Sequence, residues 1–298
     1  MSSTVDLQNV FNLQGRIALV SGGGTGIGLM IARGLAANGA KVYIGGRRKE
    51  VLETVAAECL AQGTGTVIPL PLDVSDRDSI IKAKNIIEER DGKLHILVNN
   101  AGIVGPVSHF LNNPDAPQNA NAETLGSALF NDDGPDAWST LYKTNTFSIY
   151  YMTTAFLGLL DKGSRDIEGY TSSVVNITSV SGILKIAQRH FAYNSAKAAA
   201  GHLTKMLATE IALKGIPVRV NAIAPGVYAT EITLDTITSL EDVAKVSQSL
   251  IPVPAGRAGT NGEIAGTVIY LSSKAGCYTN GQEIVVDGGY AAVNPSTA

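Results

Sequence analysis

The sequence predicts a doubly wound α/β fold, in which a seven-stranded parallel sheet is flanked by helices. Short β-branched runs alternate with longer helical patterns, and each run ends at Gly, Asp, Asn or Ser. The 298 residues include 32 glycines and one tryptophan, which indicates many tight turns. Parallel strands are buried on both faces and therefore read as compact apolar runs, so this alternation is typical of a layered α/β protein.

The apolar runs predict seven strands, at residues 16–21, 41–45, 66–70, 95–99, 174–178, 218–223 and 283–286. Helical patterns predict helices at 27–38 and 48–62, each followed by a glycine, and at 192–214. A further helix is predicted at 76–90, with Ser75 as its candidate N-cap. No Pro/Ser-rich linker interrupts the alternation, so residues 1–298 are expected to form a single domain.

Composition restricts the classes of function. Twenty-six acidic and 23 basic side chains give a formal charge of -3, which offers no field to hold nucleic acid or an anionic membrane. Two cysteines and four histidines show no disulfide framework and no metal-ligand spacing, so no metal is expected. Residues 1–14 lack the basic and apolar regions of a secretory signal. We therefore expect a cytoplasmic protein that acts on a small molecule.

The first predicted strand leads directly into a glycine-rich turn that opens a helix. A strand before the turn and a helix after it bring backbone N–H groups and the positive helix end to one point, which suits a pyrophosphate. Glycine lets the backbone approach the phosphates closely. The alternative is a turn that only packs the helix on the sheet. The pattern predicts a dinucleotide site of the Rossmann type, with the candidate residues Gly22, Gly24, Thr25, Gly26, Ile27 and Gly28.

The end of the second predicted strand bears on the choice of dinucleotide. NAD-binding folds usually carry an acidic side chain there, which accepts a hydrogen bond from the ribose 2′-OH. This chain has Gly46, followed by Arg47 and Arg48. A small residue leaves room for a 2′-phosphate, and guanidinium groups bind phosphate through charge-assisted hydrogen bonds. We therefore expect NADP(H) rather than NAD(H), the alternative being that the arginines form a solvated helix start.

Tyr193 and Lys197 are four residues apart, which puts both side chains on one face of the predicted helix. A nearby ammonium group is expected to lower the pKa of the phenol, making it a usable proton donor and acceptor. Ser179 follows a predicted strand and lies at the carboxyl edge of the sheet, where a hydroxyl group can orient a carbonyl. Ser179 could instead cap a turn, as could Ser181.

These motifs, in this order, resemble the short-chain dehydrogenases/reductases of the compact, single-domain type. The resemblance covers about residues 16–290, and its C-terminal part is most similar to 3-oxoacyl-carrier-protein reductase-like members. The motifs are Ser21-Gly22, Gly26-Ile27-Gly28, Asn99-Asn100-Ala101-Gly102, Ser179, Tyr193 with Lys197, and Pro225-Gly226.

The resemblance implies a Rossmann fold that binds NAD(P)(H), and an assembly as a homodimer or homotetramer. It implies that Tyr193 is the acid/base, that Lys197 also holds the nicotinamide ribose, and that Ser179 polarises the substrate oxygen. Asn145 would anchor a proton-relay water. The adenine side, the ribose wall and the nicotinamide clamp would be formed by Asp73, Val74, Asn99, Ala101, Gly102, Pro225, Gly226 and Thr230.

Two departures from the family pattern leave questions open. One extra residue between the serine and the tyrosine leaves a choice between Ser179 and Ser181. Residues 103–136 form a long segment rich in Asn, Asp and Pro, without sustained periodicity. We expect either a rim over the substrate or an excursion that packs on itself or on a neighbouring subunit. The rim would use the apolar residues Val104, Val107, Phe110, Leu111, Leu125, Leu129 and Phe130.

Together these features predict an NADPH-dependent carbonyl reductase that works reversibly on a ketone and a secondary alcohol. A non-catalytic NADP(H) sensor on the same fold is the alternative from another class, because fold alone does not imply function. The presence of Asn145, Ser179, Tyr193 and Lys197 together counts against it. An epimerase or dehydratase is disfavoured because 298 residues leave little room for a separate substrate domain.

Overall fold

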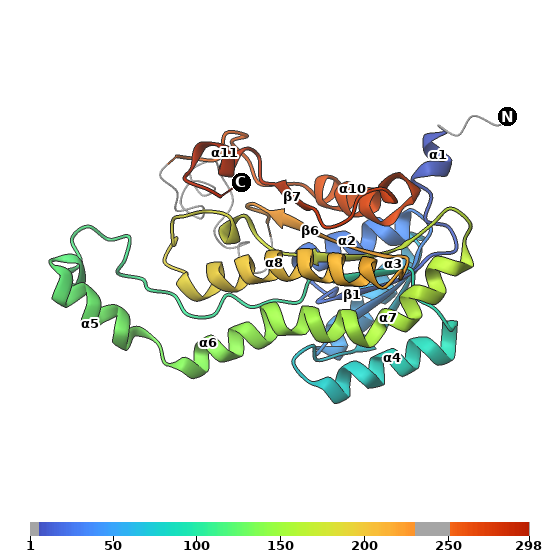
Figure 1. The fold of residues 1–298 in the computed structure, drawn as a ribbon, viewed down its shortest axis with the longest axis horizontal. Coiled ribbons are helices and arrows are strands. Elements are labelled where there is room, and N and C mark those ends of the chain that lie inside the picture. Colours follow the sequence, from blue (N-terminus) through green and yellow to red (C-terminus); the bar gives the residue numbers. More distant parts are fainter. Residues whose placement is uncertain (1–5, 230–250, 298) are drawn as a thin grey trace.

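The computed structural model describes residues 6–229 and 251–297, which contain one seven-stranded sheet (Figure 1). Its strands follow the order β3-β2-β1-β4-β5-β6-β7, and every neighbouring pair is parallel. The predicted fold class is confirmed, and each predicted strand lies within two residues of an observed one. The strands are β1 (Ile17–Ser21), β2 (Lys41–Gly46), β3 (Thr66–Pro71), β4 (Ile96–Asn99), β5 (Ser172–Ile177), β6 (Val218–Pro225) and β7 (Glu283–Val286).

Helices connect the strands. The α-helices are α1 (Leu7–Val10), α2 (Gly26–Ala37), α3 (Lys49–Ala61), α4 (Arg77–Asp91), α5 (Ala122–Asp132), α6 (Pro135–Tyr142), α7 (Ser148–Asp166), α8 (Phe191–Leu213), α10 (Asn261–Ser272) and α11 (Tyr290–Val293). The shorter turns are η1 (Pro117–Asn119), η2 (Lys143–Phe147), η3 (Val180–Gly182) and η4 (Lys274–Gly276), of which η2 is π-helical.

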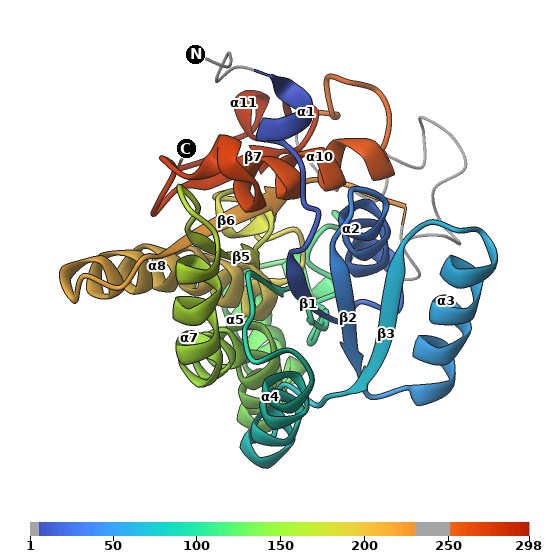
Figure 2. The same ribbon diagram turned by 90° about the vertical axis from the view of Figure 1, so that its right-hand side faces the viewer.

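Two apolar layers cover the two faces of the sheet (Figure 2). Successive side chains of a strand point to opposite faces, so Leu19 of β1 joins one layer while Ala18 and Val20 join the other. The first layer is completed by α4, α7 and α8, and the second by α2, α3 and α10. This double covering explains why the strands are apolar throughout.

The direction of the connections reverses beside β1. The chain proceeds from β1 to β2 and β3 on one side, and then returns to place β4 on the other side of β1. The hydroxyl of Ser21 ties the two strand ends together, because it accepts the N–H groups of Asn100 at 3.0 Å and Ala101 at 3.1 Å. In open α/β sheets, ligands bind in the crevice at such a reversal. The fold therefore places a binding crevice beyond Ser21 and Asn99.

Two local predictions need correction. The N-cap of α4 is Asp76 rather than Ser75, because the Asp76 carboxylate accepts the N–H of Asp78 at 3.0 Å. The segment 103–136 also contains regular structure, namely η1, all of α5 and the start of α6. A capping box between Asn121 and Thr124 starts α5, since each side chain bonds the backbone N–H of the other residue.

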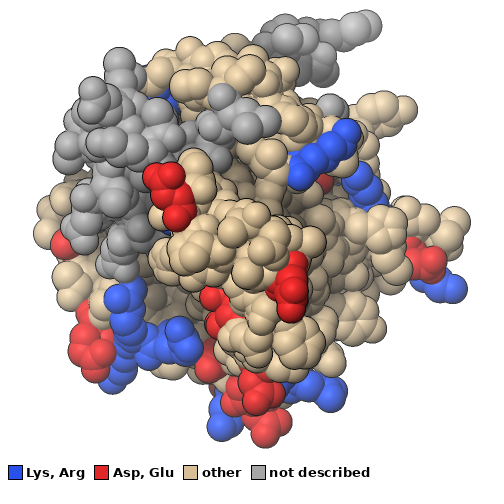
Figure 3. Space-filling model, turned by 90° about the vertical axis from the view of Figure 1, so that its left-hand side faces the viewer, with Lys and Arg blue, Asp and Glu red and all other residues tan. Residues whose placement is uncertain are grey.

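Helix α5 lies at one end of the molecule, away from the sheet (Figure 1). None of its residues is buried, and Phe130 is 86% exposed. Figure 3 shows that the face at this end is mostly uncharged, with small groups of acidic and basic side chains. Among the described residues, no helix is both long enough and apolar enough to span a membrane.

Candidate active site

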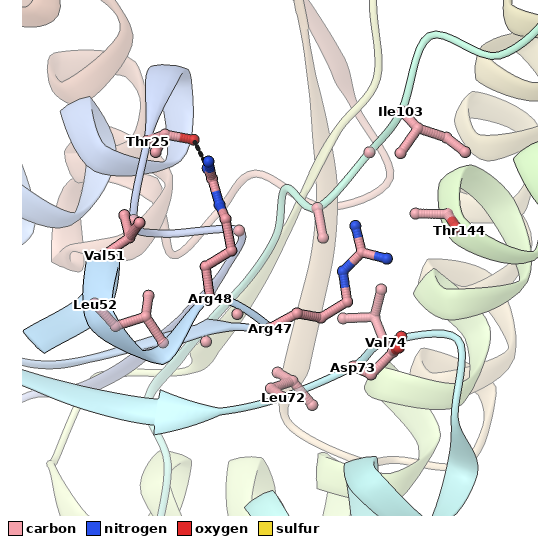
Figure 4. A pocket seen from close by; sticks show the side chains of 16 residues that line it. Thr25, Arg47, Arg48, Val51, Leu52, Leu72, Asp73, Val74, Ile103 and Thr144 are labelled. Atoms are coloured by element: carbon pink, nitrogen blue, oxygen red, sulfur yellow. Dashed lines mark hydrogen bonds between the residues drawn. The ribbon is translucent and has the colours of Figure 1, made fainter. Parts of the chain in front are cut away.

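A pocket opens at the carboxyl ends of β1, β2 and β4, where the sheet order reverses (Figure 4). Nine predicted residues line it, namely Gly22, Gly24, Thr25, Arg47, Arg48, Asp73, Val74, Ala101 and Gly102. Gly46, which the sequence analysis singled out for the room it leaves, also lines the pocket. The lining residues that the sequence did not single out are Gly45, Val51, Leu52, Leu72, Ile103 and Thr144. The predicted residues Gly26, Ile27, Gly28, Asn99, Pro225 and Gly226 do not line this pocket.

The glycine turn between β1 and α2 requires glycine for two different reasons. Gly22 has a φ of +64°, a conformation that costs glycine little and other residues more. At Gly28, a Cβ atom would lie 2.1 Å from the carbonyl oxygen of Gly22, so the close packing of α2 on the turn excludes any side chain. The turn thus exposes backbone at the pocket while Gly28 fixes the N-terminus of α2 behind it.

Two arginines reach the pocket from the end of β2 (Figure 4). Arg48 contacts the hydroxyl of Thr25 at 3.5 Å. Arg47 points toward Asp73 and Val74 on the opposite wall. The pKa of Asp73 is lowered, mainly by its hydrogen bonds from Ser75 and in part by the positive charge of Arg47. The pocket therefore combines a glycine turn with two cationic side chains, a suitable environment for phosphate groups.

Asn99 has a different position from the one that the resemblance implied. Asn99 is 5% exposed and its side chain lies between the sheet and α7, where Nδ2 donates to Thr153 Oγ1 at 3.2 Å and to Asn176 Oδ1 at 2.9 Å. Backbone positions after it, Ala101 and Gly102, form the pocket wall. Asn99 thus holds β4 to β5 and α7 beneath the pocket. Because Asn99 is the last residue of a strand and precedes a turn, the sequence does not reveal whether its side chain lines the pocket or holds neighbouring elements together.

Of the three residues predicted to form the nicotinamide clamp, the structure describes Pro225 and Gly226. Gly226 follows the last residue of β6, and its N–H donates to the carbonyl of Val286 at 3.0 Å. A Cβ atom at Gly226 would lie 2.7 Å from the Cα atom of Asp287, so glycine is needed for this close approach. Pro225 is the terminal residue of β6. Thr230 lies outside the described residues.

The predicted catalytic side chains meet where β5 ends and α8 begins. The hydroxyl of Ser179 caps η3 by accepting the Ser181 N–H at 3.1 Å, and it lies close enough to Tyr193 to lower the pKa of the phenol. The ammonium group of Lys197 donates to the carbonyl of Ile177 at 2.8 Å and lies 5.7 Å from the centre of the Tyr193 ring. Ser181 turns away from this cluster, because its hydroxyl donates to Gln188 Oε1 at 2.8 Å. Of the two candidate serines, Ser179 is the one that contacts the tyrosine.

Burial decides the protonation of this cluster. It raises the pKa of Tyr193, while the hydrogen bond with Ser179 lowers it. Burial also lowers the pKa of Lys197 to about 8. The expectation that the ammonium group lowers the pKa of the phenol is therefore corrected. Removal of both groups from water disfavours both charged forms, and the net direction for Tyr193 is upward.

Asn145 lies in η2, the π-helical turn between α6 and α7, and its side chain is 2% exposed. Its Nδ2 donates to the carbonyl of Ile103 at 2.8 Å, and its Oδ1 accepts the Ile103 N–H at 2.9 Å. The next residue, Thr146, donates its hydroxyl to the Ala196 carbonyl at 2.9 Å. Turn η2 thereby joins the pocket wall to α8, a position consistent with the frequent use of π-turns at functional sites.

The segment 103–136 divides into two parts with different surroundings. Its first residues and the following helix α6 pack near Tyr193, in a small apolar cluster built on Leu141, Ala192 and Ala196. Gly105 packs so closely on Leu141 that a Cβ atom would lie 2.6 Å from the leucine. Helix α5 projects away from this cluster (Figure 1). Within the segment, the contacts with the candidate site are therefore those of its first residues, such as Ile103 and Gly105.

No group of three or more potential metal ligands occurs in residues 6–229 and 251–297. The described part of the site instead consists of a phosphate-compatible pocket and a buried Ser-Tyr-Lys cluster, both built on residues at or beyond the carboxyl ends of strands. Such an arrangement suits proton transfer to a group held beside a bound dinucleotide.

Comparisons with known proteins agree with this geometry. The family profile described as "Enoyl-(Acyl carrier protein) reductase" matches residues 22–291. The short-chain dehydrogenase/reductase PhomF of Diaporthe leptostromiformis is 38% identical over 97% of this chain and 96% of its own length. The rhamnolipids biosynthesis 3-oxoacyl-[acyl-carrier-protein] reductase of Pseudomonas aeruginosa is 34% identical over 94% of this chain and 98% of its own.

A solved structure supports the same assignment. The Pseudomonas aeruginosa RhlG/NADP active-site complex superposes with a TM-score of 0.80 at 32% identity, covering 95% of this chain and 98% of that one. The sheet order, the pocket at its reversal and these matches point to one family. The chain belongs to the short-chain dehydrogenases/reductases.

Proposed function

We propose that this chain, as a single catalytic domain, is an NADP(H)-dependent oxidoreductase that interconverts a ketone and a secondary alcohol. The contact between Ser179 and Tyr193, with Lys197 beside the ring, carries this proposal. These groups can bind and protonate one carbonyl oxygen. The pocket lined by the glycine turn and two arginines supports dinucleotide binding at the same edge of the sheet.

The residues of the pocket fit NADP(H). Gly22, Gly24 and Thr25 would hold the pyrophosphate, helped by the N-terminus of α2. Arg47 and Arg48 would bind the 2′-phosphate, and Gly46 offers no carboxylate to repel it. Asp73 and Val74 would border the adenine, with Ala101 and Gly102 beside the ribose, while Pro225 and Gly226 are proposed to border the nicotinamide. The relative solved with NADP supports the same choice.

When bound, the cofactor supplies or accepts a hydride. The residues of the chain manage the oxygen and its proton. In reduction, the Tyr193 hydroxyl donates its proton to the substrate oxygen as that oxygen gains negative charge, and Ser179 orients the same oxygen by hydrogen bonding. In oxidation, Tyr193 accepts the proton. Because burial raises the pKa of Tyr193, the phenol is held in the protonated form that reduction requires.

Lys197 contributes charge and position. With its pKa lowered to about 8, the buried amine is still mostly protonated at neutral pH. Its bond to the Ile177 carbonyl fixes it next to the Tyr193 ring. There its positive charge is proposed to offset only part of the cost that burial adds to the phenolate formed on proton transfer, since the net pKa of Tyr193 is raised. Asn145 is proposed to assist proton relay from η2. Its two bonds to Ile103 hold that turn in place.

A screen of NADPH oxidation over ketones graded by size and polarity tests this function. We expect measurable turnover with a subset of ketones. Chiral analysis of the alcohol products should then show a single enantiomer. NADPH binding without turnover across the panel would favour the non-catalytic sensor instead.

The chain is further proposed to assemble as a homodimer or homotetramer. The support is a set of large apolar side chains that are exposed on η2, α7 and α8, namely Phe147, Tyr150, Tyr151, Phe191, Met206 and Leu213. Such surfaces often mark protein interfaces. Sedimentation at micromolar concentration is expected to show an oligomer, and a particle of 31.0 kDa would contradict this proposal. The cytoplasmic location stays a prediction of the sequence.

A further inference from the structure

Two residues of the loop between Ser179 and Tyr193 adopt the left-handed region, although neither is glycine. Gln188 has a φ of +51° and Arg189 a φ of +67°. Among the described residues, every other residue with a positive φ is a glycine. Such conformations cost free energy and persist only where surrounding contacts impose them, often at functional sites. The loop is therefore held in an unfavourable conformation directly before the helix that carries Tyr193.

The side-chain amide of Gln188 joins two elements that lie far apart in the chain. Its Oε1 accepts the hydroxyl of Ser181 at 2.8 Å, and its Nε2 donates to the hydroxyl of Tyr290 at 2.8 Å. Ser181 belongs to η3, and Tyr290 is the first residue of α11. Tyr290 is 1% exposed and packs in the same apolar cluster as Val180. One side chain thus fastens the left-handed turn to two separate elements.

The Ser181 end of this connection reaches the candidate catalytic serine. The Ser179 hydroxyl oxygen accepts the backbone N–H of Ser181, while the Ser181 hydroxyl donates to Gln188. Ser181 therefore contacts Ser179 with its backbone and Gln188 with its side chain. Because the N–H occupies a lone pair of the Ser179 oxygen, the hydroxyl is oriented and still has its own proton to donate to a substrate oxygen.

The other end of the loop reaches the candidate catalytic tyrosine. His190 directly follows the two left-handed residues, and its ring contacts the Tyr193 ring edge-on, with the centroids 6.4 Å apart. Asn194 closes the loop on α8, since its Nδ2 donates to the carbonyls of Ile186 at 3.1 Å and Ala187 at 3.0 Å. The direction in which the chain enters α8, and with it the position of Tyr193, therefore depends on this turn.

We propose that Gln188 is a positioning residue that sets the separation between the hydroxyl groups of Ser179 and Tyr193. This inference rests on the proposed function, in which both hydroxyls bind one carbonyl oxygen. Both can do so only within a narrow range of separations, because hydrogen bonds weaken steeply away from their usual length and angle. Ser181 and Tyr290 act through Gln188, which gives the second serine of the motif a role in positioning.

Two substitutions each remove one bond of Gln188 and leave its own residue type unchanged, namely Ser181→Ala and Tyr290→Phe. With a ketone that the wild-type protein reduces, each should lower kcat about tenfold, because small displacements of reacting groups are costly. The Kd for NADPH should change by less than about twofold. Ser181→Thr keeps a hydroxyl group and should retain most of the wild-type kcat.

Tyr170→Phe controls for a loss of stability. Tyr170 is buried like Tyr290, and its hydroxyl is bonded to the carbonyls of His95 and Ser272 at 3.1 Å each. It lies near the amino ends of the strands, because His95 directly precedes β4. Tyr170→Phe should therefore lower the midpoint temperature of thermal unfolding but keep kcat within about twofold of the wild-type value. A loss of kcat equal to that of Tyr290→Phe would overturn the proposal.

The Ser179→Ala background separates positioning from a general effect on the structure. If Gln188 acts on the separation of the two hydroxyls, Tyr290→Phe should lower kcat much less in Ser179→Ala than in the wild-type protein, because one of these hydroxyls is absent. Equal factors in the two backgrounds would contradict the positioning role. So would wild-type kcat in both Ser181→Ala and Tyr290→Phe.

An NMR measurement separates this proposal from the proposed function. In protein labelled with carbon-13 at the tyrosine Cζ atoms, the signal of Tyr193 is identified by its loss in Tyr193→Phe. This signal should shift in Ser181→Ala and Tyr290→Phe, in the direction seen for Ser179→Ala, and stay in place in Tyr170→Phe. If no ketone is turned over, such shifts would keep the positioning role and remove the reductase function. An unshifted Tyr193 signal in Ser181→Ala and Tyr290→Phe would reject the positioning role, whatever the turnover.

Discussion

Asn145 and Ile103 are joined by a pair of hydrogen bonds, in which the asparagine amide bonds both the N–H and the carbonyl of the isoleucine backbone. These residues are 42 positions apart in the chain. Their pairing holds the π-helical turn η2 against the residue that follows the pocket wall at Ala101 and Gly102. The pair therefore couples the cofactor pocket to the elements that surround Tyr193.

Asn145→Ala should remove both bonds and leave two backbone groups of Ile103 without partners. The expected loss in the free energy of unfolding is about 1–3 kcal/mol, the range for a buried polar group left unbonded. The midpoint temperature of thermal unfolding and the kcat/KM should both decrease. Asn131→Ala, on the exposed helix α5, is the control and should change neither. A stable Asn145→Ala variant with wild-type activity would show that the pairing has no such role.

Arg47→Ala should weaken the binding of NADPH by about 1.5–3 kcal/mol and leave that of NADH almost unchanged, because only NADPH carries the 2′-phosphate. Titrations that follow the cofactor fluorescence measure the Kd values for NADPH and for NADH. Lys49→Ala serves as the control, since Lys49 is an exposed cation two residues further along the chain, at the start of α3, and pairs with Glu53. An equal loss for NADPH and NADH would refute the role assigned to Arg47.

Gly46→Asp should shift the preference toward NADH, by repelling the 2′-phosphate and by accepting a bond from the ribose hydroxyl. The structure has room for this change. A Cβ atom at Gly46 would lie 3.4 Å from Leu52, which is ordinary van der Waals contact. The ratio of kcat/KM with NADH to that with NADPH is the measurement. A variant that keeps its wild-type ratio would place the 2′-phosphate elsewhere.

His95 should make the protein less stable in mild acid. It is fully buried, its Nδ1 accepts the Ile17 N–H at 3.0 Å, and burial lowers its pKa to about 4. From pH 6.5 down to 4, the unfolded chain binds a proton that the folded chain does not. The contribution of His95 to stability is therefore fully present above pH 6.5 and lost as the pH falls toward 4, on the order of 3 kcal/mol in total.

Urea unfolding of the wild-type protein and of His95→Asn, from pH 7.5 to 4.5, measures this contribution. Asparagine can accept the Ile17 N–H without titrating. The variant should lose less stability than the wild-type protein over this range. Parallel pH profiles for the two proteins would show that His95 is not responsible.

Helix α5, which lies within the segment 103–136, and Leu141, which follows that segment, should respond differently to change. Replacement of residues 122–132 by a Gly/Ser linker of equal length should alter stability by less than about 0.5 kcal/mol, because α5 buries no side chain. Leu141→Ala should cost about 2–5 kcal/mol, because Leu141 is fully buried in the cluster near Tyr193. Thermal and urea unfolding compare the two. A strongly destabilised linker variant would indicate that α5 is covered, for example by a second copy of the chain.

The sequence predicts this fold well because local patterns carry it. Runs such as 174–178 are β-branched and apolar, and the parallel sheet follows from their alternation with helices. Helix α5 was missed because Gly126, Ser127 and the flanking Asn and Asp residues hide its periodicity, although the capping pair Asn121 and Thr124 was a usable signal.

The site is predictable only where its residues are neighbours in the chain. The spacing of Tyr193 and Lys197 indicates their proximity, and the pair lies beside Ser179 as expected. The bond between Asn145 and Ile103, the inward direction of Asn99 and the left-handed backbone of Arg189 depend on contacts between distant segments. Local spacing also does not reveal how deeply Tyr193 is buried, and this is why the expected direction of its pKa was wrong.

The turnover of Tyr193→Phe tests the account most directly. The substitution keeps the ring and removes only the hydroxyl group that is proposed to carry the proton. With a ketone that the wild-type protein reduces, kcat should fall at least 100-fold, the lower end for loss of general acid catalysis, while the Kd for NADPH changes by less than about twofold. A Tyr193→Phe variant that keeps half of the wild-type kcat would contradict the proposed mechanism.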